Sequence, residues 1–370
     1  MKIVRLANYV GPRSGGMRTA LRELGAGYLA AGHEPVLVVP GPADSDERTP
    51  QGRVITLSGP IIPLTGGYRA MLHRSRITTL LDDLLPDRIE VSDRTTLRWT
   101  GRWARDHGIP SVMVSHESLT ALFGGRRPAR LVADLLNRRT ARRYDQVICT
   151  TSWAAAEFER LGVANLNKIS LGVDLDLFHP AASDPALRAE LAGPGEILLV
   201  HCGRLSPEKK PGLSLAAVRE LRASGIPAVL VIAGDGPLRR RLERLAQRWM
   251  APVRFAGFIS DSTRLASLLA TADVVLAPGP AETFGLAALE ALACGTPVVV
   301  NVASALSEVA GRAGVAVAGR HLAAGVRTVL SWPELPRRAA ARARACEFGW
   351  PSAVGGFLKV HECQTQLEQA

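Results

Sequence analysis

The sequence is short of aromatic residues and has no long hydrophobic run. Phenylalanine, tyrosine and tryptophan make up 5% of its 370 residues. No stretch approaches the roughly 18 to 20 consecutive apolar residues that a helix needs to cross a bilayer, which argues against a membrane-spanning chain. The opening residues MKIVRLANYV show no apolar region followed by a cleavage site, so we expect no signal peptide and a soluble, cytoplasmic chain.

Cysteine is also sparse. The cysteines form no Cys-x-x-Cys motif, which indicates unpaired thiols in a reducing compartment and argues against a structural zinc site. They are Cys149, Cys202, Cys294, Cys346 and Cys363. No cluster of histidines or carboxylates suggests another metal, so we expect no metal or other cofactor.

Acidic residues are fewer than basic ones. The chain has 45 basic and 34 acidic residues, a formal net charge of +11, and only five of the basic residues are lysine. Composition leaves open whether this reflects codon usage in a GC-rich genome or binding to an anionic membrane, a nucleic acid or a small anion. Nucleic acid is disfavoured, because aromatic residues are not interleaved with the basic ones and no reader motif is recognisable.

Apolar segments that suit buried strands alternate with helical segments along the chain. Near-continuous apolar runs are typical of parallel strands covered on both faces, and their alternation with helices predicts an α/β fold. A first series of strands is expected at 2–8, 35–39, 88–93, 111–117 and 146–151, and a second at 196–206, 228–237, 253–260, 273–279 and 296–301.

Two strand series indicate two Rossmann-like domains with parallel sheets that face each other across a deep cleft, which is the expected ligand site. The loop-rich stretch KISLGVDLDLFHPAASDP between the series is expected to act as a hinge. The expected boundaries are 1–172 for the first domain, 173–182 for the hinge and 183–350 for the second domain. A final helix at 351–370 either closes the second domain or crosses back to the first.

Two expected strand ends carry groups suited to an anion. Gly15 and Gly16 lie where the first strand turns into a helix, so they form either a plain tight turn or a close backbone approach to a ligand. Arg204 and Lys209 follow a strand in the segment HCGRLSPEKK, at the sheet edge where open α/β sheets bind ligands. They are either a solvated surface pair or, as their position favours, a diphosphate site.

The segment GPAETFGLAALEALACGTPVVV (279–300) holds two glutamates in an apolar setting, where carboxylates need partners. We expect Glu282 in a loop and a helix from Thr283 or Phe284, with Glu290 about 12 Å farther along by helical rise. Amides in the first helical turn have no helical partners and can bind phosphate. Those amides belong to Phe284, Gly285 and Leu286. The whole pattern suits the sugar hydroxyls, diphosphate and ribose of a nucleotide sugar.

Three aspartates have two interpretations each. Asp261 in AGFISDSTRL is either the N-cap of a helix or a contact to a base. Asp174 and Asp176 match a D-x-D metal-binding pattern, but they lie in the expected hinge beside no strand-end phosphate site. We therefore interpret them as turn residues.

Four motifs in register resemble those of one enzyme family. GRLSPEKK resembles a G-R-x4-K motif, ETFGLAALE matches E-x7-E, LGVDLDLFHP resembles an N-G-V-D-x-x-x-F-x-P hinge with Leu171 in place of asparagine, and ACGTPVVV also matches. Together they resemble the retaining glycosyltransferases of the two-Rossmann (GT-B) fold over essentially the whole chain. A more specific resemblance is to the actinobacterial phosphatidylinositol mannoside mannosyltransferases. It is carried by the segments LANYVGPRSGGMRTAL, TGGYRA, VSHE and APGPAETFGLAALEALACGTP.

The resemblance implies transfer of an α-1,6-mannose from GDP-mannose to a phosphatidylinositol dimannoside. For the diphosphate, the resemblance implies binding by Arg204 and Lys209, with Gly16 near it. For the sugars, it implies Glu282 at the donor sugar and Glu290 at the ribose. The backbone amides of Phe284, Gly285 and Leu286 would contact phosphate or sugar oxygens, and Asp261 and Arg264 would lie beside the purine. His116 would face the transferred sugar unless it is a structural histidine, and Tyr9, Arg18 and Arg69 would contact the acceptor. The family retains anomeric configuration without an obvious enzymatic nucleophile, by leaving-group stabilisation and front-face attack.

The segment RRPARLVADLLNRRTARRYD (126–145) places an apolar helical stripe between two groups of arginines. The stripe consists of Leu131, Val132, Leu135 and Leu136. The segment is either an ordinary solvated helix or a surface that rests on anionic lipid at the inner face of the plasma membrane.

Two enzymatic alternatives stay open at this point. One is a glycosyltransferase of the same fold with another donor or a soluble acceptor. The other is a nucleotide-sugar 2-epimerase, which would act on the donor without an acceptor.

Overall fold

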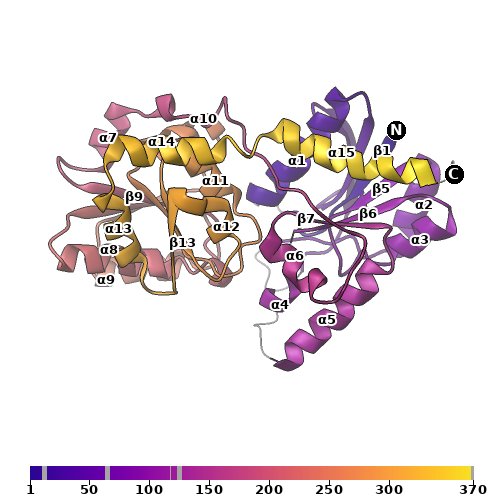
Figure 1. Ribbon diagram of the computed structural model, residues 1–370, viewed down its shortest axis with the longest axis horizontal. Coiled ribbons are helices and arrows are strands. Elements are labelled where there is room, and N and C mark those ends of the chain that lie inside the picture. Colours follow the sequence, from indigo (N-terminus) through magenta and orange to yellow (C-terminus); the bar gives the residue numbers. More distant parts are fainter. Residues whose placement is uncertain (11–14, 63–66, 117, 123–126, 368–370) are drawn as a thin grey trace. The chain divides into compact units, whose positions relative to one another are not determined.

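The chain divides into two compact α/β units (Figure 1). Unit 1 consists of Met1–Gly172 together with the C-terminal segment from Trp350, and unit 2 consists of Val173–Gly349. The structure is a computed structural model that describes residues 1–10, 15–62, 67–116, 118–122 and 127–367.

Unit 1 is built on an eight-stranded sheet with the order β3-β4-β2-β1-β5-β6-β7-β8. Neighbouring strands are parallel, except that β3 and β4 are antiparallel. The strands are β1 (Lys2–Leu6), β2 (Glu34–Gly41), β3 (Ser45–Thr49), β4 (Gly52–Ser58), β5 (Arg88–Val91), β6 (Ser111–Ser115), β7 (Gln146–Cys149) and β8 (Leu166–Lys168). The five strands predicted for the first series are confirmed. The strands β3, β4 and β8 were not predicted, since they are partly exposed or very short.

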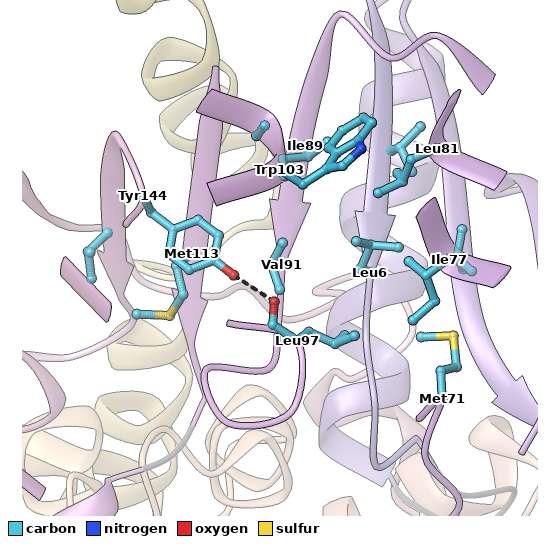
Figure 2. Packing of buried hydrophobic residues seen from close by; sticks show 14 of the residues in the cluster. Leu6, Met71, Ile77, Leu81, Ile89, Val91, Leu97, Trp103, Met113 and Tyr144 are labelled. Atoms are coloured by element: carbon cyan, nitrogen blue, oxygen red, sulfur yellow. Dashed lines mark hydrogen bonds between the residues drawn. The ribbon is translucent and has the colours of Figure 1, made fainter. Parts of the chain in front are cut away.

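One face of this sheet carries the larger apolar core of unit 1. Leu6 and Val91 of adjacent strands pack with Ile77 and Leu81 of α2 and with Trp103 of α3 (Figure 2). At its edge the Tyr144 hydroxyl donates to the Leu97 carbonyl at 3.2 Å. The helices of unit 1 are α1 (Gly15–Ala30), α2 (Arg74–Leu84), α3 (Thr100–Asp106), α4 (Leu119–Leu122), α5 (Arg127–Ala141), α6 (Ser152–Glu159) and α15 (Trp350–Leu367).

The other face of the sheet holds a buried polar network between α1 and α15. Because side chains alternate along a strand, Arg5 of β1 points away from the core that contains Val4 and Leu6. Its Nε donates to Glu90 at 2.8 Å, and Tyr28 donates to the second Glu90 oxygen at 2.7 Å. His361 of α15 lies 3.3 Å from the same oxygen. Burial opposes ionisation of Glu90, but Arg5, His361 and Tyr28 hold the pKa of its carboxyl well below the usual range.

Unit 2 has a six-stranded, wholly parallel sheet with the order β11-β10-β9-β12-β13-β14. Its strands are β9 (Ile197–Cys202), β10 (Ala228–Ala233), β11 (Val253–Gly257), β12 (Val274–Ala277), β13 (Val298–Asn301) and β14 (Gly314–Val317). The five strands predicted for the second series are confirmed, and β14 was missed. Its short helical turns are η1 (Pro180–Ala182), η2 (Pro207–Lys209) and η3 (Gly311–Ala313).

Helices cover both faces of the sheet in unit 2. Residues of α8, α9 and α13 join one core with the strands, and α10, α11, α12 and α14 lie on the other face (Figure 1). These helices are α7 (Pro185–Leu191), α8 (Gly212–Ala223), α9 (Arg239–Arg248), α10 (Ser262–Thr271), α11 (Leu286–Ala293), α12 (Leu306–Ala310), α13 (Leu322–Ser331) and α14 (Glu334–Ala345).

The strand order in each unit locates its crevice. The chain starts at β1 in one sheet and at β9 in the other, and later strands are added first on one side and then on the other. The topological switch points are therefore β1/β5 and β9/β12, where open α/β sheets bind ligands at the carboxyl ends of the strands.

The segment 173–182, predicted as a hinge, packs within unit 2. Arg342 of α14 donates to the carbonyls of Leu175 and Phe178. Asp174 accepts from the amides of Asp176 and Leu177 at 3.1 and 2.9 Å, which confirms the interpretation of this pair as turn residues. Among the described helices, none is both long and apolar enough to cross a membrane.

Candidate functional site

Unit 2 brings two of the predicted residues into contact at the β9/β12 switch point. Lys209, in η2 after β9, forms an ion pair with Glu282, which follows β12. Their side chains are 31% and 20% exposed, so the pair is accessible to a ligand from the carboxyl edge of the sheet. The loops are close here, since a Cβ added at Gly279 would lie 3.2 Å from the Lys209 Cα.

Arg204 reaches the same edge through a tight backbone crossing. It follows β9 after Gly203, whose carbonyl lies 1.9 Å from where a Cβ on Gly234 would stand. Gly234 has a φ of 155° and Gly236 a φ of 159°, and a Cβ at Gly236 would meet the Leu205 carbonyl at 2.6 Å. Glycine is therefore required after β10 so that the Arg204 loop can lie against it.

The loop that carries Glu282 is held by its own neighbours. Asn301, at the end of β13, is buried and donates its side-chain amide to the Pro278 carbonyl at 2.9 Å. The Ala305 amide donates to the Glu282 carbonyl at 3.0 Å. Phe284 is buried and packs edge-on against Phe348, with ring centroids 6.1 Å apart. These contacts place Glu282 without engaging its carboxylate.

The predicted start of the next helix was wrong. Helix α11 begins at Leu286, after Gly285 in the left-handed conformation with a φ of 82°. Only glycine suits this position, because an added Cβ would also lie 2.1 Å from a Leu306 methyl group. The amides of Phe284 and Gly285 therefore precede the helix and do not belong to its first turn. No backbone partner is found in the described parts of the chain for these amides or for that of Leu286.

The late start of α11 also corrects the predicted position of Glu290. Only four helical steps separate it from Leu286, so the helical rise between them is about 6 Å and the 12 Å derived above does not apply. Glu290 is half-buried and lies within electrostatic reach of Cys202, at the end of β9. Burial and the Glu290 charge raise the pKa of the Cys202 thiol to about 12. Glu290 thus lies toward the same strand end as Arg204.

The residues predicted beside the base follow β11. Asp261 is the N-cap of α10 and accepts from the amides of Thr263 and Arg264 at 2.9 and 3.4 Å. The capping interpretation is confirmed, and one oxygen of the carboxylate makes both bonds. Asp261 and Arg264 are exposed, and their contact to a purine stays a prediction.

Unit 1 brings together some of the predicted acceptor residues beyond β1. Tyr9 has a φ of 60°, and its amide donates to the Arg69 carbonyl at 3.3 Å. Asn8 was missed by the sequence analysis, although it directly follows a buried strand. It accepts from the Met71 amide at 2.8 Å and donates to Thr96 and Asp93, so it joins the ends of β1 and β5.

His116 directly follows β6 in unit 1. It is half-buried, and its Nε2 lies 3.2 Å from the hydroxyl of Ser92, which follows β5. Burial lowers the pKa of His116 to about 4, and nearby Arg5 and Arg94 act in the same direction. The imidazole is therefore neutral near pH 7. Ser92 is a second group that the sequence analysis missed.

Gly16 and Arg18 lie in the first turns of α1 and are exposed. The two glycines were expected in the turn before this helix, but Gly15 and Gly16 are both part of α1. Parts of the predicted motifs fall outside the described residues: 11–14 of GPRSGG, 65–66 of TGGYRA, Glu117 of VSHE, and Arg126.

The arrangement in unit 2 suits a polyol diphosphate. Arg204 and Lys209 can stabilise negative charge, and Glu282 and Glu290 can accept hydrogen bonds from hydroxyls. In the described part of the chain, no group of three or more histidines, cysteines, aspartates or glutamates is placed to hold a metal ion.

Comparison with protein families matches nearly the whole chain in two pieces. Residues 184–345 match the family described as glycosyl transferases group 1, and residues 15–168 match the glycosyl transferase 4-like domain. These ranges lie in unit 2 and unit 1, respectively.

Full-length relatives agree with the family matches. The chain is 51% identical over 365 residues to the GDP-mannose-dependent alpha-(1-6)-phosphatidylinositol dimannoside mannosyltransferase of Mycobacterium tuberculosis, covering 97% of this chain and 95% of that protein. It is 30% identical to the glycogen synthase of the same species, with 94% and 91% covered. Among solved structures, sucrose-phosphate synthase from Thermosynechococcus elongatus matches with a TM-score of 0.79 at 22% identity, covering 100% of both chains.

Proposed function

Because the chain belongs to the group 1 glycosyltransferases, we propose that it transfers mannose from GDP-mannose to a phosphatidylinositol dimannoside, forming an α-1,6 linkage. The activity is that of its 51% identical mycobacterial relative, with which it aligns over nearly its full length. The structural observation that carries the proposal is the convergence of Arg204, Lys209, Glu282 and Glu290 at the β9/β12 switch point. This crevice is where a nucleotide sugar binds to an open parallel sheet.

On the donor side, the proposed catalysis consists of stabilising the negative charge on the departing diphosphate. Arg204 and Lys209 bind the diphosphate and offset the negative charge that develops as GDP leaves. Glu282 orients Lys209 through their ion pair and holds hydroxyls of the donor sugar. The amides of Phe284, Gly285 and Leu286 contact phosphate or sugar oxygens, and Glu290 holds the ribose. Asp261 and Arg264 flank the purine, and Gly16 of unit 1 approaches the diphosphate.

The transferred sugar and the acceptor are proposed to contact unit 1. His116 is neutral near pH 7 and is held by Ser92, so it can hydrogen-bond a sugar hydroxyl without adding charge. Tyr9, Arg18 and Arg69 are the acceptor-side residues. The incoming hydroxyl attacks from the face that GDP leaves, so anomeric configuration is retained without an enzymatic nucleophile.

We propose that the reaction needs no metal. The two cations after β9 can supply the charge stabilisation that a divalent ion provides in other transferases. Asp174 of the D-x-D pattern uses its carboxylate to cap a turn.

Because the proposed acceptor is a lipid, the enzyme would act at the surface of an anionic membrane leaflet. Helix α5 has a surface that suits binding to such a leaflet. Leu131, Val132 and Leu135 are 71%, 52% and 49% exposed on this helix. Arg138, Arg139 and Arg142 are exposed near its end. Exposed apolar residues flanked by arginines are typical of helices that lie in a membrane interface. We propose that the enzyme is peripheral at the inner face of the plasma membrane.

A donor panel tests the proposed function. GDP-mannose, UDP-glucose and UDP-N-acetylglucosamine are each assayed with phosphatidylinositol dimannoside, without acceptor, and with EDTA. We expect transfer from GDP-mannose only, dependence on the lipid acceptor and little effect of the chelator. Transfer from a UDP-sugar alone would overturn the donor assignment. Epimerised or free sugar formed without acceptor would point to an epimerase or hydrolase.

A further inference from the structure

Helix α9 of unit 2 concentrates positive charge that the fold does not use. Its ten residues, RRRLERLAQR, contain five arginines and one acid. Glu243 accepts from Arg239 at 2.8 Å. The remaining arginines are exposed, and no carboxylate pairs with them in the part of the chain that the structure describes. They are Arg240, Arg241, Arg244 and Arg248, and we call them the α9 arginine row.

The position of these arginines is unfavourable for the helix itself. Arg240, Arg244 and Arg248 are spaced four residues apart, so each repels the next along one side of the helix. The helix starts with three arginines and has no acid in its first turn, although the positive end of the helix dipole favours negative charge there. The helix therefore does not need these charges for its own stability.

The arginine-rich composition of the chain does not explain the α9 arginine row, because the arginines of α14 form hydrogen bonds with the rest of unit 2. Arg338 donates to the carbonyls of Ala270 and Ala272, and Arg342 donates to those of Phe178 and Ala293. The α14 arginines thus bind neighbouring segments of unit 2. In α9, the one further arginine bond found is from Arg244 to the Arg240 carbonyl within the same helix.

An exposed apolar side chain ends the row. Met250 is 91% exposed and has a φ of 48°, directly after Trp249, whose ring lies 5.0 Å from the Arg219 guanidinium. Among the apolar residues of α9 itself, Leu242 and Ala246 are buried in the core of unit 2, and Leu245 packs against that core partly buried. The outer surface therefore combines a line of cations with one flexible apolar side chain.

We propose that the α9 arginine row, with Met250 at its end, docks unit 2 onto an anionic lipid surface. The row complements a plane of headgroup phosphates in charge, and methionine can enter the apolar layer beneath the headgroups. A single-stranded nucleic acid would need stacking aromatics, and Trp249 is already covered by Arg219. The proposal rests on the proposed function, which places the enzyme at a lipid acceptor, and adds a contact separate from α5.

Vesicle binding by the full chain tests this surface. The test variant is Arg240→Gln, Arg244→Gln and Arg248→Gln together. The control is Arg254→Gln, Arg312→Gln and Arg320→Gln, which removes the same charge from exposed positions elsewhere in unit 2. On phosphatidylcholine vesicles that contain phosphatidylinositol, we expect the test variant to lose on the order of ten- to a hundredfold in partitioning. The control should lose less than about threefold, and both should bind pure phosphatidylcholine equally weakly.

Equal losses in the two variants would show that net charge alone matters and would overturn the proposal. Unchanged binding of the test variant would also overturn it, as would tighter binding of the wild-type chain to single-stranded RNA than to vesicles. A measurement without variants guards against misfolding. Anionic vesicles should slow hydrogen exchange in the wild-type chain at 239–250, and unchanged exchange there would contradict docking.

The design separates this proposal from the proposed function. Vesicle binding is measured without donor or acceptor, so it does not depend on the reaction. If the wild-type chain binds through α9 but transfers no mannose from GDP-mannose, the docking surface stands and the proposed function fails. Transfer to a water-soluble, short-chain dimannoside should be unaffected in the test variant, because the lipid surface is absent from that assay.

Discussion

Lys209 and Glu282 are 73 residues apart in the sequence and form an ion pair because β9 and β12 are adjacent strands. Each side chain restricts the other, so Glu282 positions Lys209 in addition to the hydroxyl-binding role that we propose for it. The glycines around them allow neighbouring segments to approach closely, since there is no room for a Cβ at Gly234 or Gly285. At this scale the site depends on close backbone approach as much as on charge.

Single substitutions at Arg204 and at the Lys209–Glu282 pair should separate charge stabilisation from folding. We expect Arg204→Ala, Lys209→Ala and Glu282→Gln each to lower kcat/KM for mannose transfer by roughly 10²- to 10³-fold, because each weakens stabilisation of the leaving diphosphate. The measurement is steady-state transfer, with circular dichroism to check folding. Lys210→Ala is the matched control, since Lys210 is the exposed neighbour of Lys209. Near-normal turnover in Arg204→Ala or Glu282→Gln would contradict this site.

At the scale of elements, α11 and α5 differ in where their apolar side chains lie. Helix α11 is apolar on nearly all sides and mostly buried, and its Glu290 lies within electrostatic reach of Cys202 at the end of β9. Helix α5 instead leaves the apolar side chains of Leu131, Val132 and Leu135 exposed. Exposed apolar residues grouped on one helix mark a contact surface.

The α5 surface should contribute to membrane binding. Replacing Arg138, Arg139 and Arg142 by Gln removes three cations, each worth about 1 kcal/mol near an anionic leaflet. We expect weaker co-sedimentation with phosphatidylinositol-containing vesicles and little change in thermal stability. A companion change, Leu131→Ser, should weaken binding even at high salt, where electrostatic attraction is screened. If neither change reduces vesicle binding, α5 is an ordinary solvated helix.

At the scale of the whole molecule, each unit has its own core, and the C-terminal helix belongs to the first unit. Helix α15 packs so closely on α1 that a Cβ on Gly27 would lie 2.3 Å from a Val354 methyl group. His361 of α15 completes the buried Arg5–Glu90 pair. Burial of neutral histidines elsewhere couples folding to pH.

Stability should fall as the pH is lowered from about 6.5 to about 4. Burial lowers the pKa of both His116 and His201 to about 4, against 6.5 for a free histidine. In this window the unfolded chain binds more protons, so each histidine contributes stability that is complete above pH 6.5 and lost by pH 4. The loss is on the order of 3 kcal/mol for each group.

Urea unfolding at a series of pH values checks this expectation. The His201→Gln variant should show a shallower decline between pH 6.5 and 4 than the wild-type chain, whatever its stability at pH 7. Glu90 acts in a lower range, because its depressed pKa contributes stability that is lost only as the carboxyl becomes protonated. A stability that is constant from pH 7 to 4.5 would show that the two histidines are not held neutral in the folded chain.

The strand positions, and the sheet edge at which the candidate residues Arg204, Lys209 and Glu282 lie, could be predicted from sequence because both follow local rules. Parallel strands buried on two faces appear as apolar runs, and residues just after such runs lie at one sheet edge. The start of α11 could not be predicted in this way, because the left-handed conformation of Gly285 and its close approach to Leu306 appear only in the tertiary structure. The polar edge strand β3 has no apolar run, so its pairing with β4 was invisible.

The sequence by itself determined the α/β class, the two families of strands, and the Arg204, Lys209, Glu282 and Glu290 pattern, since these depend on periodicity and spacing along the chain. Only the tertiary structure decided which residues meet: the Lys209–Glu282 pair, the Ser92 contact to His116, and the return of α15 to unit 1. It also distinguished arginines that bind the fold, as in α14, from the exposed row on α9. The physical reason is that contacts between distant segments depend on strand order and backbone approach, which no local pattern records.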